Sequence, residues 1–358
     1  MVAVKNFIFY LLGIVPKLFL KKYPTNQNNY LFVLLSNPLG DFVSRLNFFS
    51  SINLEEEIPQ VYLALDKKFE ELKHLLDSRI KLIFIESGSY KFNPFHKYLV
   101  LNQLNQIGFG LTINLSVDRG MFSDEVTVSP NSKHKITIQR KTEFLSNFFL
   151  SKNNKKYSQI IDLSPSNEYD KLEVLKKYLN NNYGVKFRTE KDIQQVIIKK
   201  DYFVIAPFSS QVIQSWPIEN YFDLIDRLKE KSKIIILGNP KNVDRKYYNY
   251  ENPNVENLIS KTNLKEADRI IKNASLFIGN DSGLAHLAYF HKIPLVAIIG
   301  GGNYGQFFPH GNAAANRFLF NKIDCFNCRW KCKYNEPFCL TNVTVDSVLD
   351  NINEVLHA

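Results

Sequence analysis

Hydrophobic residues in this chain gather in short runs with few polar interruptions. Eight such runs lie at residues 30–36, 61–65, 80–85, 111–115, 202–206, 234–237, 276–278 and 295–299. Runs of this length are typical of strands that are buried on both faces, as in parallel sheets. Stretches with helical spacing of their apolar residues lie between several of them, for example at 172–179 and 221–228. This alternation of strands and helices predicts an α/β fold.

The segment from Ser275 to Gly300 shows this order most clearly. A strand at 276–278 is followed by a polar turn, Gly279–Gly283, a short helix at 284–290 and the strand at 295–299. In open parallel sheets, ligands bind at the carboxyl ends of strands, where this turn is expected. The free N–H groups and the positive dipole end of the helix favour an anion there. The alternative is an ordinary turn without a ligand.

Length and charge narrow the classes of function. A chain of 358 residues predicts roughly two domains, and 45% hydrophobic and 22% charged residues are globular values. The net charge of +10 favours an acidic partner, such as a phosphorylated glycan or an anionic lipid surface. Nucleic acid is the least expected partner, because the chain shows neither an RNA-binding signature nor a concentrated basic run. The polar, lysine-rich stretch 185–200 predicts a domain boundary, which gives domains of residues 1–195 and 196–358.

The segment at residues 7–22 combines an apolar stretch, 7–15, with Lys17, Lys21 and Lys22. The apolar stretch is too short to span a bilayer, which takes about 20 residues, and no small-residue cleavage site of a signal peptide follows it. Two interpretations stay open: a helix that packs on the body of the protein, and an interfacial segment with aromatic and basic anchors. The second would give the chain a peripheral membrane contact.

The amino-acid sequence of this turn is more informative than the order of strand, turn and helix alone. The sequence Gly279-Asn-Asp-Ser-Gly-Leu-Ala-His286, followed by Ile293-Pro294 and Gly300, resembles the donor-binding motif of the heptosyltransferases, glycosyltransferase family 9. The resemblance implies two Rossmann-like domains that face a cleft, the GT-B arrangement, with the acceptor bound by the first domain and the nucleotide sugar by the second. It also implies inverting transfer from a nucleotide-activated sugar, typically ADP-heptose, without a catalytic metal. The final helix, after Thr344, is expected to pack back toward the first domain.

Two further stretches resemble the family's pattern. The strand at 31–36 and the Gly40-Asp41 turn resemble its first motif, in which this aspartate is the catalytic base; a helix-capping role for Asp41 is the compatible alternative. Residues 202–240 resemble the strand, small-residue loop and Trp-Pro helix of the second domain. Family members commonly carry a basic residue where this chain has Gln214. In this chain, Gly300–Gly302 begin a loop that is longer than the one family members usually have. Its glycines are expected to let a ligand approach the backbone; a glycine-rich surface loop is the alternative.

The resemblance assigns the candidate site residues by position. Asp41 is the expected catalytic base. Gly40 and Arg119 are expected at the acceptor, although Arg119 fits a surface salt bridge equally well. The expected donor-binding residues follow strands of the second domain and are Ser209, Ser210, Gln214, Gly238, Asp281, Ser282, Gly283, Leu284 and His286.

All four cysteines fall in one run, Cys325-x2-Cys328-x3-Cys332-x6-Cys339. One zinc ion with four thiolate ligands, two disulfides or reduced thiols are compatible with this spacing. A cytoplasmic location argues against disulfides, and similar clusters occur near this point in some family members. We expect a structural zinc ion or reduced thiols, and no cofactor that catalysis requires.

The sequence therefore predicts an inverting, metal-independent glycosyltransferase. It is expected to move a sugar, heptose by resemblance, from a nucleotide-sugar donor such as ADP-heptose to lipopolysaccharide core or another anionic glycolipid. The expected location is the cytoplasm, at the inner face of the cytoplasmic membrane if residues 7–22 are interfacial. Two alternatives stay open: a transferase of the same family with a different nucleotide sugar, and a non-catalytic relative that binds sugar nucleotides or glycans. The presence of both Asp41 and Asp281 argues against the second.

Overall fold

The computed structural model describes residues 1–21, 23–35, 38–55, 59–140, 142–188, 201–240 and 244–357. The predicted domain boundary at 195/196 lies outside these residues, as does Lys22 of the N-terminal segment. The described chain divides into two compact units. The first comprises residues 1–42, 48–164 and 173–188, and the second comprises residues 43–47, 165–172 and 201–357.

The first unit is built on a six-stranded parallel sheet with the strand order β3-β2-β1-β4-β5-β6. The strands are β1 (Asn29–Leu34), β2 (Gln60–Asp66), β3 (Lys81–Ile85), β4 (Phe109–Asn114), β5 (Ser132–Ile138) and β6 (Gln159–Ile161). Val33 of β1 pairs with Ala64 of β2 on one side and with Asn114 of β4 on the other. The order reverses between β1 and β4, which is the topology of a Rossmann-like domain.

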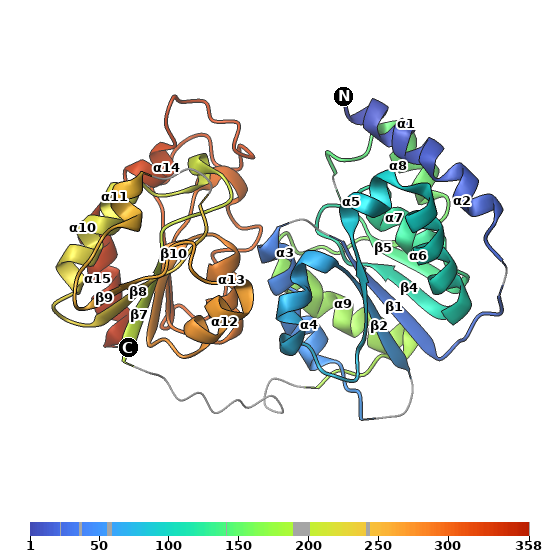
Figure 1. Ribbon diagram of the computed structural model, residues 1–358, viewed down its shortest axis with the longest axis horizontal. Coiled ribbons are helices and arrows are strands. Elements are labelled where there is room, and N and C mark those ends of the chain that lie inside the picture. The colour runs from blue at the N-terminus through green and yellow to red at the C-terminus, as the bar shows by residue number, and fades with distance from the viewer. Residues whose placement is uncertain are drawn as a thin grey trace. The chain divides into compact units, whose positions relative to one another are not determined.

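The helices of this unit lie on both sides of the sheet (Figure 1). They are α1 (Val2–Leu12), α2 (Ile14–Leu18), α3 (Leu39–Val43), α4 (Leu46–Ser51), the 3₁₀ helix η1 (Lys67–Leu75), α5 (Ser87–Phe92), α6 (Pro94–Ile107), α7 (Met121–Val128), α8 (Asn147–Asn154) and α9 (Glu168–Tyr183). Helix α7 packs directly on β1 and β4, and α1 packs on α5 and α7. The N-terminal segment is therefore an outer layer of the first unit.

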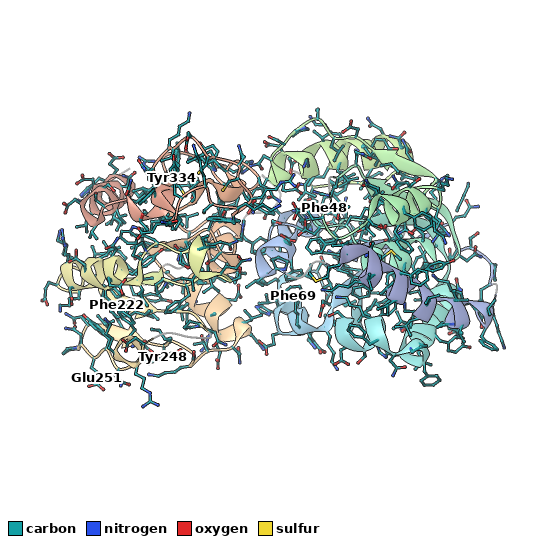
Figure 2. All side chains as sticks on the ribbon, turned by 90° about the horizontal axis from the view of Figure 1, so that it is seen from above. Phe48, Phe69, Phe222, Tyr248, Glu251 and Tyr334 are labelled. Carbon is teal, nitrogen blue, oxygen red and sulfur yellow. The ribbon has the colours of Figure 1, made fainter. Side chains whose placement is uncertain are left out.

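Phenylalanine contributes much of the core of the first unit. Phe32 of β1 is fully buried and packs edge-on against Phe48 of α4, with ring centroids 5.8 Å apart. Phe69 of η1 stacks on Phe42 of α3 at 4.9 Å; Phe48 and Phe69 are labelled in Figure 2. These ring contacts fix α3, and with it the turn that carries Asp41.

The second unit repeats the same topology, with the strand order β12-β11-β10-β7-β8-β9 and all strands parallel. Its strands are β7 (Tyr202–Ala206), β8 (Lys233–Ile236), β9 (Val255–Asn257), β10 (Leu276–Asn280), β11 (Leu295–Ile298) and β12 (Asn316–Leu319). Its helices are η3 (Val212–Gln214), α10 (Ile218–Leu228), α11 (Arg245–Tyr248), α12 (Leu264–Lys272), α13 (Gly283–Phe290), η4 (Gly301–Asn303), α14 (Phe338–Thr341) and α15 (Val345–Leu356). Helix α15 packs on α10, β11 and β12. The expectation that it reaches toward the first domain stays a prediction.

All eight hydrophobic runs lie in strands of these two sheets, so the predicted α/β fold with two Rossmann-like domains is confirmed. The sequence analysis missed β5, β6, β9 and β12. Strands β6 and β9 have only three residues each, which is too few for a hydrophobic pattern. The first half of β5 is only half-buried, with Lys133 exposed, and such a half-strand needs no apolar run.

Candidate functional site

The predicted site residues lie at the carboxyl ends of neighbouring parallel strands within each unit. In the second unit, Ser209 follows β7, Gly238 follows β8 and Asp281 follows β10, and these three strands are adjacent. In the first unit, Asp41 follows β1 and Arg119 follows the adjacent β4. Each group lies where the strand order reverses, which is where open α/β sheets bind ligands.

The turn after β10, residues 281–286, leads into α13. Ser282 is the N-cap of this helix, but its side chain caps no backbone N–H. Its hydroxyl oxygen is buried and has no hydrogen-bond partner among the residues that the structure describes. The first N–H groups of an α-helix also lack intrahelical partners, and the neighbouring carboxylate of Asp281 is 26% exposed. The turn therefore offers a hydroxyl, a helix N-terminus and a carboxylate to a ligand that carries both an anion and hydroxyl groups.

His286 is buried within this turn. Its Nδ1 lies 2.7 Å from the hydroxyl oxygen of Tyr169, and its Nε2 lies 3.5 Å from Oδ1 of Asp281. Burial raises the pKa of Tyr169 well above its usual value, so the hydroxyl stays protonated and can donate to Nδ1. A neutral His286 then carries its proton on Nε2, toward Asp281. His286 is thus placed to orient Asp281 from inside the protein, and Leu284 and Gly283 lie on the more exposed side of the turn.

Tyr169 is the main residue of this site that the sequence analysis missed. It belongs to the segment 165–172, which is part of the second unit although it precedes β7. Asn167 anchors the segment, because its side-chain amide donates hydrogen bonds to the carbonyls of Gly305 and Phe307 at 3.2 and 2.8 Å. One tyrosine among 18 carries no local signal of such a role, since its partner lies 117 positions away in the sequence.

A buried ion pair fixes another early segment, residues 43–47, within the second unit. The guanidinium of Arg45 is fully buried and lies 2.5 Å from Oε2 of Glu168. The other carboxylate oxygen of Glu168 accepts a hydrogen bond from Lys171 at 2.8 Å, and its backbone N–H donates to the carbonyl of Gln306 at 2.8 Å. A buried charge pair needs such additional partners to offset its desolvation. The pair thereby holds the residue next to Tyr169 in place.

Asn280, at the end of β10, ties the loop after β7 to the turn 281–286. Its fully buried side chain accepts a hydrogen bond from the backbone N–H of Trp216 and donates one to the carbonyl of Pro207, each at 2.8 Å. Trp216 in turn donates its indole N–H to the carbonyl of Val343 at 2.8 Å. The spacing between loop and turn is therefore set by one amide, which the sequence analysis did not single out.

Ser209, Ser210 and Gln214 lie in this loop, at the same sheet edge as the turn. The hydroxyl of Ser209 donates to a neighbouring backbone carbonyl at 2.6 Å, and that of Ser210 donates to Oε1 of Gln214 at 3.3 Å. Gly238 has a φ of 145°, and a Cβ there would lie 2.4 Å from the ring of Phe208. Glycine is thus required at 238 by the backbone and by packing, whatever binds beside it.

The glycine turn at 300–302 is buried and filled by protein side chains. A Cβ on Gly302 would lie 2.4 Å from the ring of Trp330, and one on Gly301 would lie 2.7 Å from the ring of Phe326. The aromatic side chains account for glycine at these positions, and the expectation that the glycines let a ligand approach the backbone stays a prediction. The glycines make room for aromatic side chains of the cysteine-containing segment.

The four cysteines are free thiols, and Cys332 lies within electrostatic range of the other three. Burial, followed by the nearby thiols of Cys328, Cys339 and Cys325, raises the pKa of Cys332. Burial also raises the pKa of Cys339. Among the described residues, no three His, Cys, Asp or Glu side chains are arranged to hold a metal ion. The zinc site stays a prediction.

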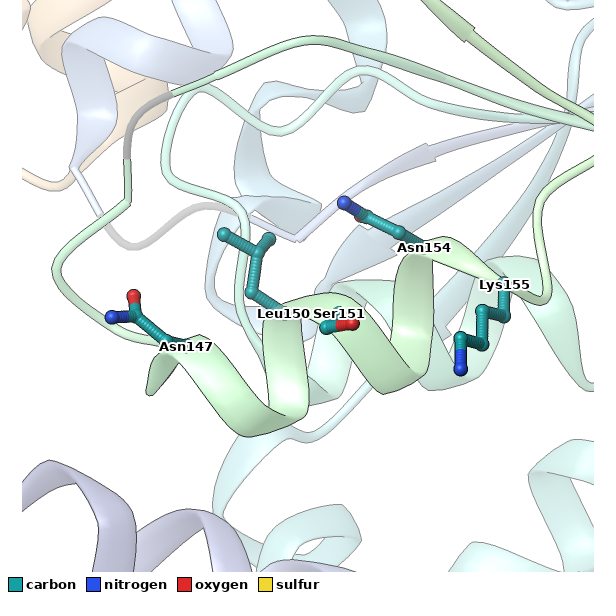
Figure 3. Close-up of a pocket in the computed structure, with 5 residues that line it drawn as sticks. All are labelled: Asn147, Leu150, Ser151, Asn154 and Lys155. Atoms are coloured by element: carbon teal, nitrogen blue, oxygen red, sulfur yellow. The ribbon is translucent and has the colours of Figure 1, made fainter.

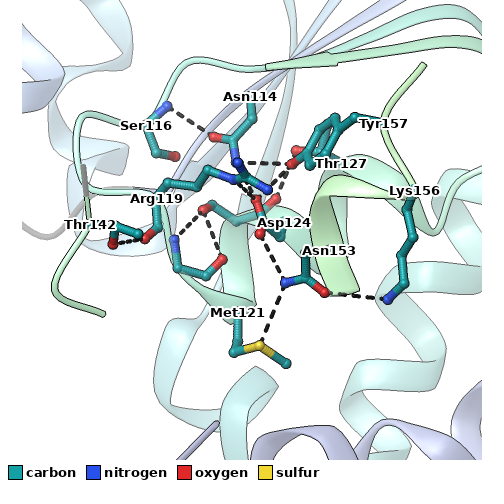
Figure 4. Close-up of polar contacts among 12 residues, drawn as sticks. Asn114, Ser116, Arg119, Met121, Asp124, Thr127, Thr142, Asn153, Lys156 and Tyr157 are labelled. Atoms are coloured by element: carbon teal, nitrogen blue, oxygen red, sulfur yellow. Dashed lines mark hydrogen bonds and ion pairs between the residues drawn. The ribbon is translucent and has the colours of Figure 1, made fainter. Parts of the chain in front are cut away.

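Arg119 is a buried residue, which corrects the interpretation of a surface salt bridge. Its Nε lies 2.6 Å from Oδ1 of Asp124, and its guanidinium covers the ring of Tyr157 at 4.7 Å. Asp124 also accepts hydrogen bonds from the hydroxyl of Tyr157 at 2.7 Å and from the side-chain amide of Asn153 at 2.9 Å (Figure 4). The partners of this ion pair, Tyr157 and Asn153, are side chains of the same unit. Arg119 therefore fixes the end of β4 and is not displayed toward solvent.

Asp41 is 5% exposed and lies in the first turn of α3. Lys68, at the start of η1 after the adjacent β2, was not predicted as a site residue. Partial burial lowers the pKa of Lys68, against the opposing charges of Asp66 and Asp41. This ammonium lies within electrostatic range of Asp41, at the same sheet edge.

A surface hollow of about 490 Å³ lies elsewhere, along α8. It is lined by Asn147, Leu150, Ser151, Asn154 and Lys155 (Figure 3). All five residues belong to one helix and the position after it, and none is a predicted site residue. The hollow is therefore not a candidate for the predicted chemistry.

We expect Tyr169→Phe to remove the hydrogen bond to His286 and keep the aromatic packing. A buried Nδ1 without its donor should lower the free energy of unfolding by about 1–3 kcal/mol. Loss of the tautomer preference should also change the NMR shifts of the His286 ring nitrogens. Tyr289→Phe is the matched control, because it removes a similar hydrogen bond, to Nδ1 of His310 at 2.6 Å. Unchanged His286 shifts in Tyr169→Phe would show that Tyr169 does not hold the ring.

Comparisons of sequence identify relatives for the larger part of this chain. Residues 114–337 match the model of glycosyltransferase family 9 (heptosyltransferase). Lipopolysaccharide heptosyltransferase 3 of Escherichia coli strain K12 is 26% identical over 119 residues, which cover 32% of this chain and 35% of that protein. Lipooligosaccharide heptosyltransferase 2 of Campylobacter jejuni is 31% identical over 106 residues, which cover 29% of this chain and 33% of that protein. The chain thus matches about a third of the length of these curated relatives.

Solved structures with a similar fold align with nearly the whole chain. E. coli heptosyltransferase WaaC with ADP-2-deoxy-2-fluoro heptose has a TM-score of 0.65 at 14% identity, over 91% of this chain and 99% of that chain. The iron-containing dodecameric glycosyltransferase TibC of enterotoxigenic E. coli has a TM-score of 0.51 at 17% identity, over 94% of this chain and 78% of that chain. The likeness confirms a fold of the GT-B type. Because the family model covers more than half of the residues, we conclude that the chain belongs to glycosyltransferase family 9.

Proposed function

We propose that this protein transfers a heptosyl group from a nucleotide-diphosphate donor to lipopolysaccharide core or a related anionic glycolipid, with inversion at the sugar carbon and without a catalytic metal. The observation that carries the proposal is the turn 281–286, where the buried hydroxyl of Ser282 and the N-terminus of α13 lack protein partners among the described residues. The names of the E. coli and Campylobacter jejuni relatives supply the sugar and the class of acceptor.

The second unit is proposed to hold the donor. A sugar that leaves a diphosphate develops positive charge, while the departing phosphate gains negative charge and needs positive potential. The N-terminus of α13 supplies part of that potential. The carboxylate of Asp281, oriented by His286, can accept hydrogen bonds from donor hydroxyls. Gln214 adds hydrogen-bond donors but no charge, whereas family members commonly carry a basic residue at this position. The missing charge supports the alternative of a family member with another nucleotide sugar.

Asp41 is proposed as the general base. As the acceptor oxygen attacks the anomeric carbon from the face opposite the diphosphate, its proton passes to the carboxylate of Asp41. The glycosidic bond forms while the bond from the sugar carbon to the phosphate oxygen breaks, so configuration inverts. The backbone at Gly40 is the proposed acceptor contact, and Lys68 supplies positive potential for an acidic acceptor. Because its guanidinium is buried against Asp124, we propose that Arg119 holds the end of β4 in position and does not contact the acceptor.

Ligand binding at the turn 281–286 is tested by thermal unfolding with and without ADP-heptose. Donor at a hundred times its Kd should stabilise the wild type by about 2.7 kcal/mol. Gly283→Leu should abolish this stabilisation, because a leucine side chain would fill the first turn of α13. Gly88→Leu is the matched control: it places the same side chain in the first turn of α5, with open space around it. Normal stabilisation of Gly283→Leu by the donor would show that the donor binds elsewhere.

Asp41→Asn is expected to lower turnover by about 10²–10⁴-fold, the usual contribution of a positioned base. It keeps the shape and a capping oxygen, so stability and donor affinity should remain close to those of the wild type. Asp77→Asn is a suitable control, since Asp77 is bound to Arg79 outside the predicted site. The measurement is transfer of the sugar to a lipopolysaccharide-core acceptor. Near-normal turnover of Asp41→Asn would leave Asp41 as a helix cap, and no transfer or hydrolysis by the wild type would favour the non-catalytic alternative.

We further propose that Cys325, Cys328, Cys332 and Cys339 hold one structural metal ion, because four convergent thiols are a donor set that zinc and iron accept. The ion would fix the segment whose Trp330 and Phe326 cover the glycine turn. Zinc is the expected metal; the iron of TibC makes iron the second element to measure. Since metal binding requires thiolates, the raised pKa of Cys332 and Cys339 must be overcome, and binding should release protons.

The cysteine proposal predicts about one zinc or iron per chain in protein purified without chelator. Retention of the metal should decrease as pH falls, because protons compete with the ion for the four thiols. Metal removal should lower the unfolding temperature, and Cys328→Ser should purify with little metal. Elemental analysis and thiol titration provide the measurement. Trace amounts of both metals, with every thiol titratable, would favour reduced thiols.

A further inference from the structure

The outward side of α1 and α2 is almost entirely apolar. Ten of the 19 exposed large apolar side chains among the described residues fall within residues 1–19: Met1, Val2, Val4, Phe7, Ile8, Leu11, Ile14, Val15, Leu18 and Phe19. Several are exposed to an unusual degree, including Leu18 at 75% and Phe19 at 67%. A surface helix of a globular protein normally presents polar residues to water. This helix pair does the reverse.

Helical spacing places the outward residues on one side. Because successive residues of an α-helix are rotated by about 100°, Val4, Phe7 and Leu11 share one side of α1. The exposed Ile14, Val15 and Leu18 continue this side along α2, since the backbone at the junction, Gly13, stays in the right-handed helical region. The buried positions Asn6, Phe9, Gly13 and Pro16 lie on the opposite side. The apolar side is thus a continuous stripe, which we name the α1–α2 stripe and define as Val4, Phe7, Ile8, Leu11, Ile14, Val15 and Leu18.

Polar contacts fix the inner side of the helix pair. The amide of Asn6 donates to the carbonyl of Phe144 and accepts from the backbone N–H of Ser146, both at 2.9 Å. Lys17 forms an ion pair with the buried carboxylate of Glu125. The interpretation that this segment packs on the body is therefore confirmed, and the stripe is held in position while it faces outward.

Neighbouring helices extend the apolar surface. Phe92 and Phe95, at the junction of α5 and α6, are 73% and 67% exposed, and Phe144 and Phe148, around the start of α8, are 56% and 68% exposed. Helix α1 contacts α5, and α2 contacts α6; Figure 1 shows α1 and α2 alongside these helices and α8. Aromatic side chains thus flank the α1–α2 stripe on two sides.

The charge around this surface is positive. Residues 1–40 contain no aspartate or glutamate, and the exposed Lys5 and Lys21 belong to the helix pair or follow it. On the α8 side, the ammonium of Lys152 lies 3.7 Å from the ring centroid of Tyr10. An apolar stripe with aromatic and lysine flanks is the pattern of a helix that lies in the interface of an anionic bilayer. A second copy of this chain fits less well, because it would bring lysines against lysines.

We propose that the α1–α2 stripe, with Phe92, Phe95, Phe144 and Phe148 beside it, inserts into the headgroup boundary of an anionic lipid bilayer. Within the described ranges, no helix is both long and apolar enough to cross a bilayer, and the proposal requires only that α1 and α2 lie in the membrane plane. It does not depend on the proposed chemistry, since any substrate presented at a membrane would benefit from such contact.

The test is co-sedimentation of the full chain with vesicles of phosphatidylcholine alone and of phosphatidylcholine mixed with phosphatidylglycerol. Binding should be stronger to the anionic vesicles and should weaken with salt. The triple variant Leu11→Gln, Val15→Gln, Leu18→Gln should bind the anionic vesicles at least about tenfold more weakly, because three apolar side chains no longer insert. Circular dichroism checks that the variant folds.

The matched control is the double variant Val174→Gln, Leu356→Gln, which changes exposed apolar residues outside this surface and should bind like the wild type. Turnover of a water-soluble acceptor analogue should be unchanged in both variants, which separates this proposal from the proposed function. Equal vesicle binding by the triple variant and the wild type would overturn the proposal. A wild-type dimer that the triple variant loses, without vesicle binding, would assign the surface to a second copy.

Discussion

The reversal of strand order between β7 and β10 is the constraint on which the second unit depends. Strands of a parallel sheet are covered on both faces by helices. Polar groups therefore gather at the carboxyl ends of β7 and β10, where the strand order reverses. Asn280 lies at this position, and its buried amide links the loop that carries Trp216 to the end of β10 through two hydrogen bonds. Helix α13 can then begin at one defined place, and its N-terminus faces the edge that ligands use in such sheets.

Groups from distant parts of the chain hold this turn from within. The chain of contacts runs from Tyr169 through His286 to Asp281, and Phe308 stacks on the imidazole with centroids 4.7 Å apart. Burial keeps water from competing for the hydrogen bond between Tyr169 and His286 and keeps the tyrosine protonated. A hydroxyl that no ligand needs to touch thus holds the imidazole that lies beside the partly exposed carboxylate of Asp281. Aromatic packing by Trp330 and Phe326 likewise accounts for the glycines of the turn 300–302.

The first unit uses buried charge to hold an apolar surface in water. Lys97 is fully buried and lies 2.9 Å from Glu125, which also binds Lys17. Burial would raise the pKa of Glu125, but the charges of Lys17 and Lys97 outweigh it and lower the pKa, so the carboxylate stays ionised. The ion pair of Lys17 holds α2 and the buried ring of Phe9 holds α1 against the unit, and the outward stripe remains in contact with water. That arrangement is unfavourable in water and becomes favourable when the stripe enters an apolar phase.

The sequence by itself determined the α/β class, eight of the strands and the positions of Asp41 and the turn 281–286, because hydrophobic runs and turn residues report local burial and local backbone geometry. Only the tertiary structure decided that Tyr169 supports His286, that Arg119 is buried against Asp124, and that the apolar residues near the N-terminus face outward. Hydrophobicity along a chain shows how much a segment gains from burial, but which partner covers it depends on contacts between remote segments. A stripe without a protein cover looks the same in sequence as one that is packed inside.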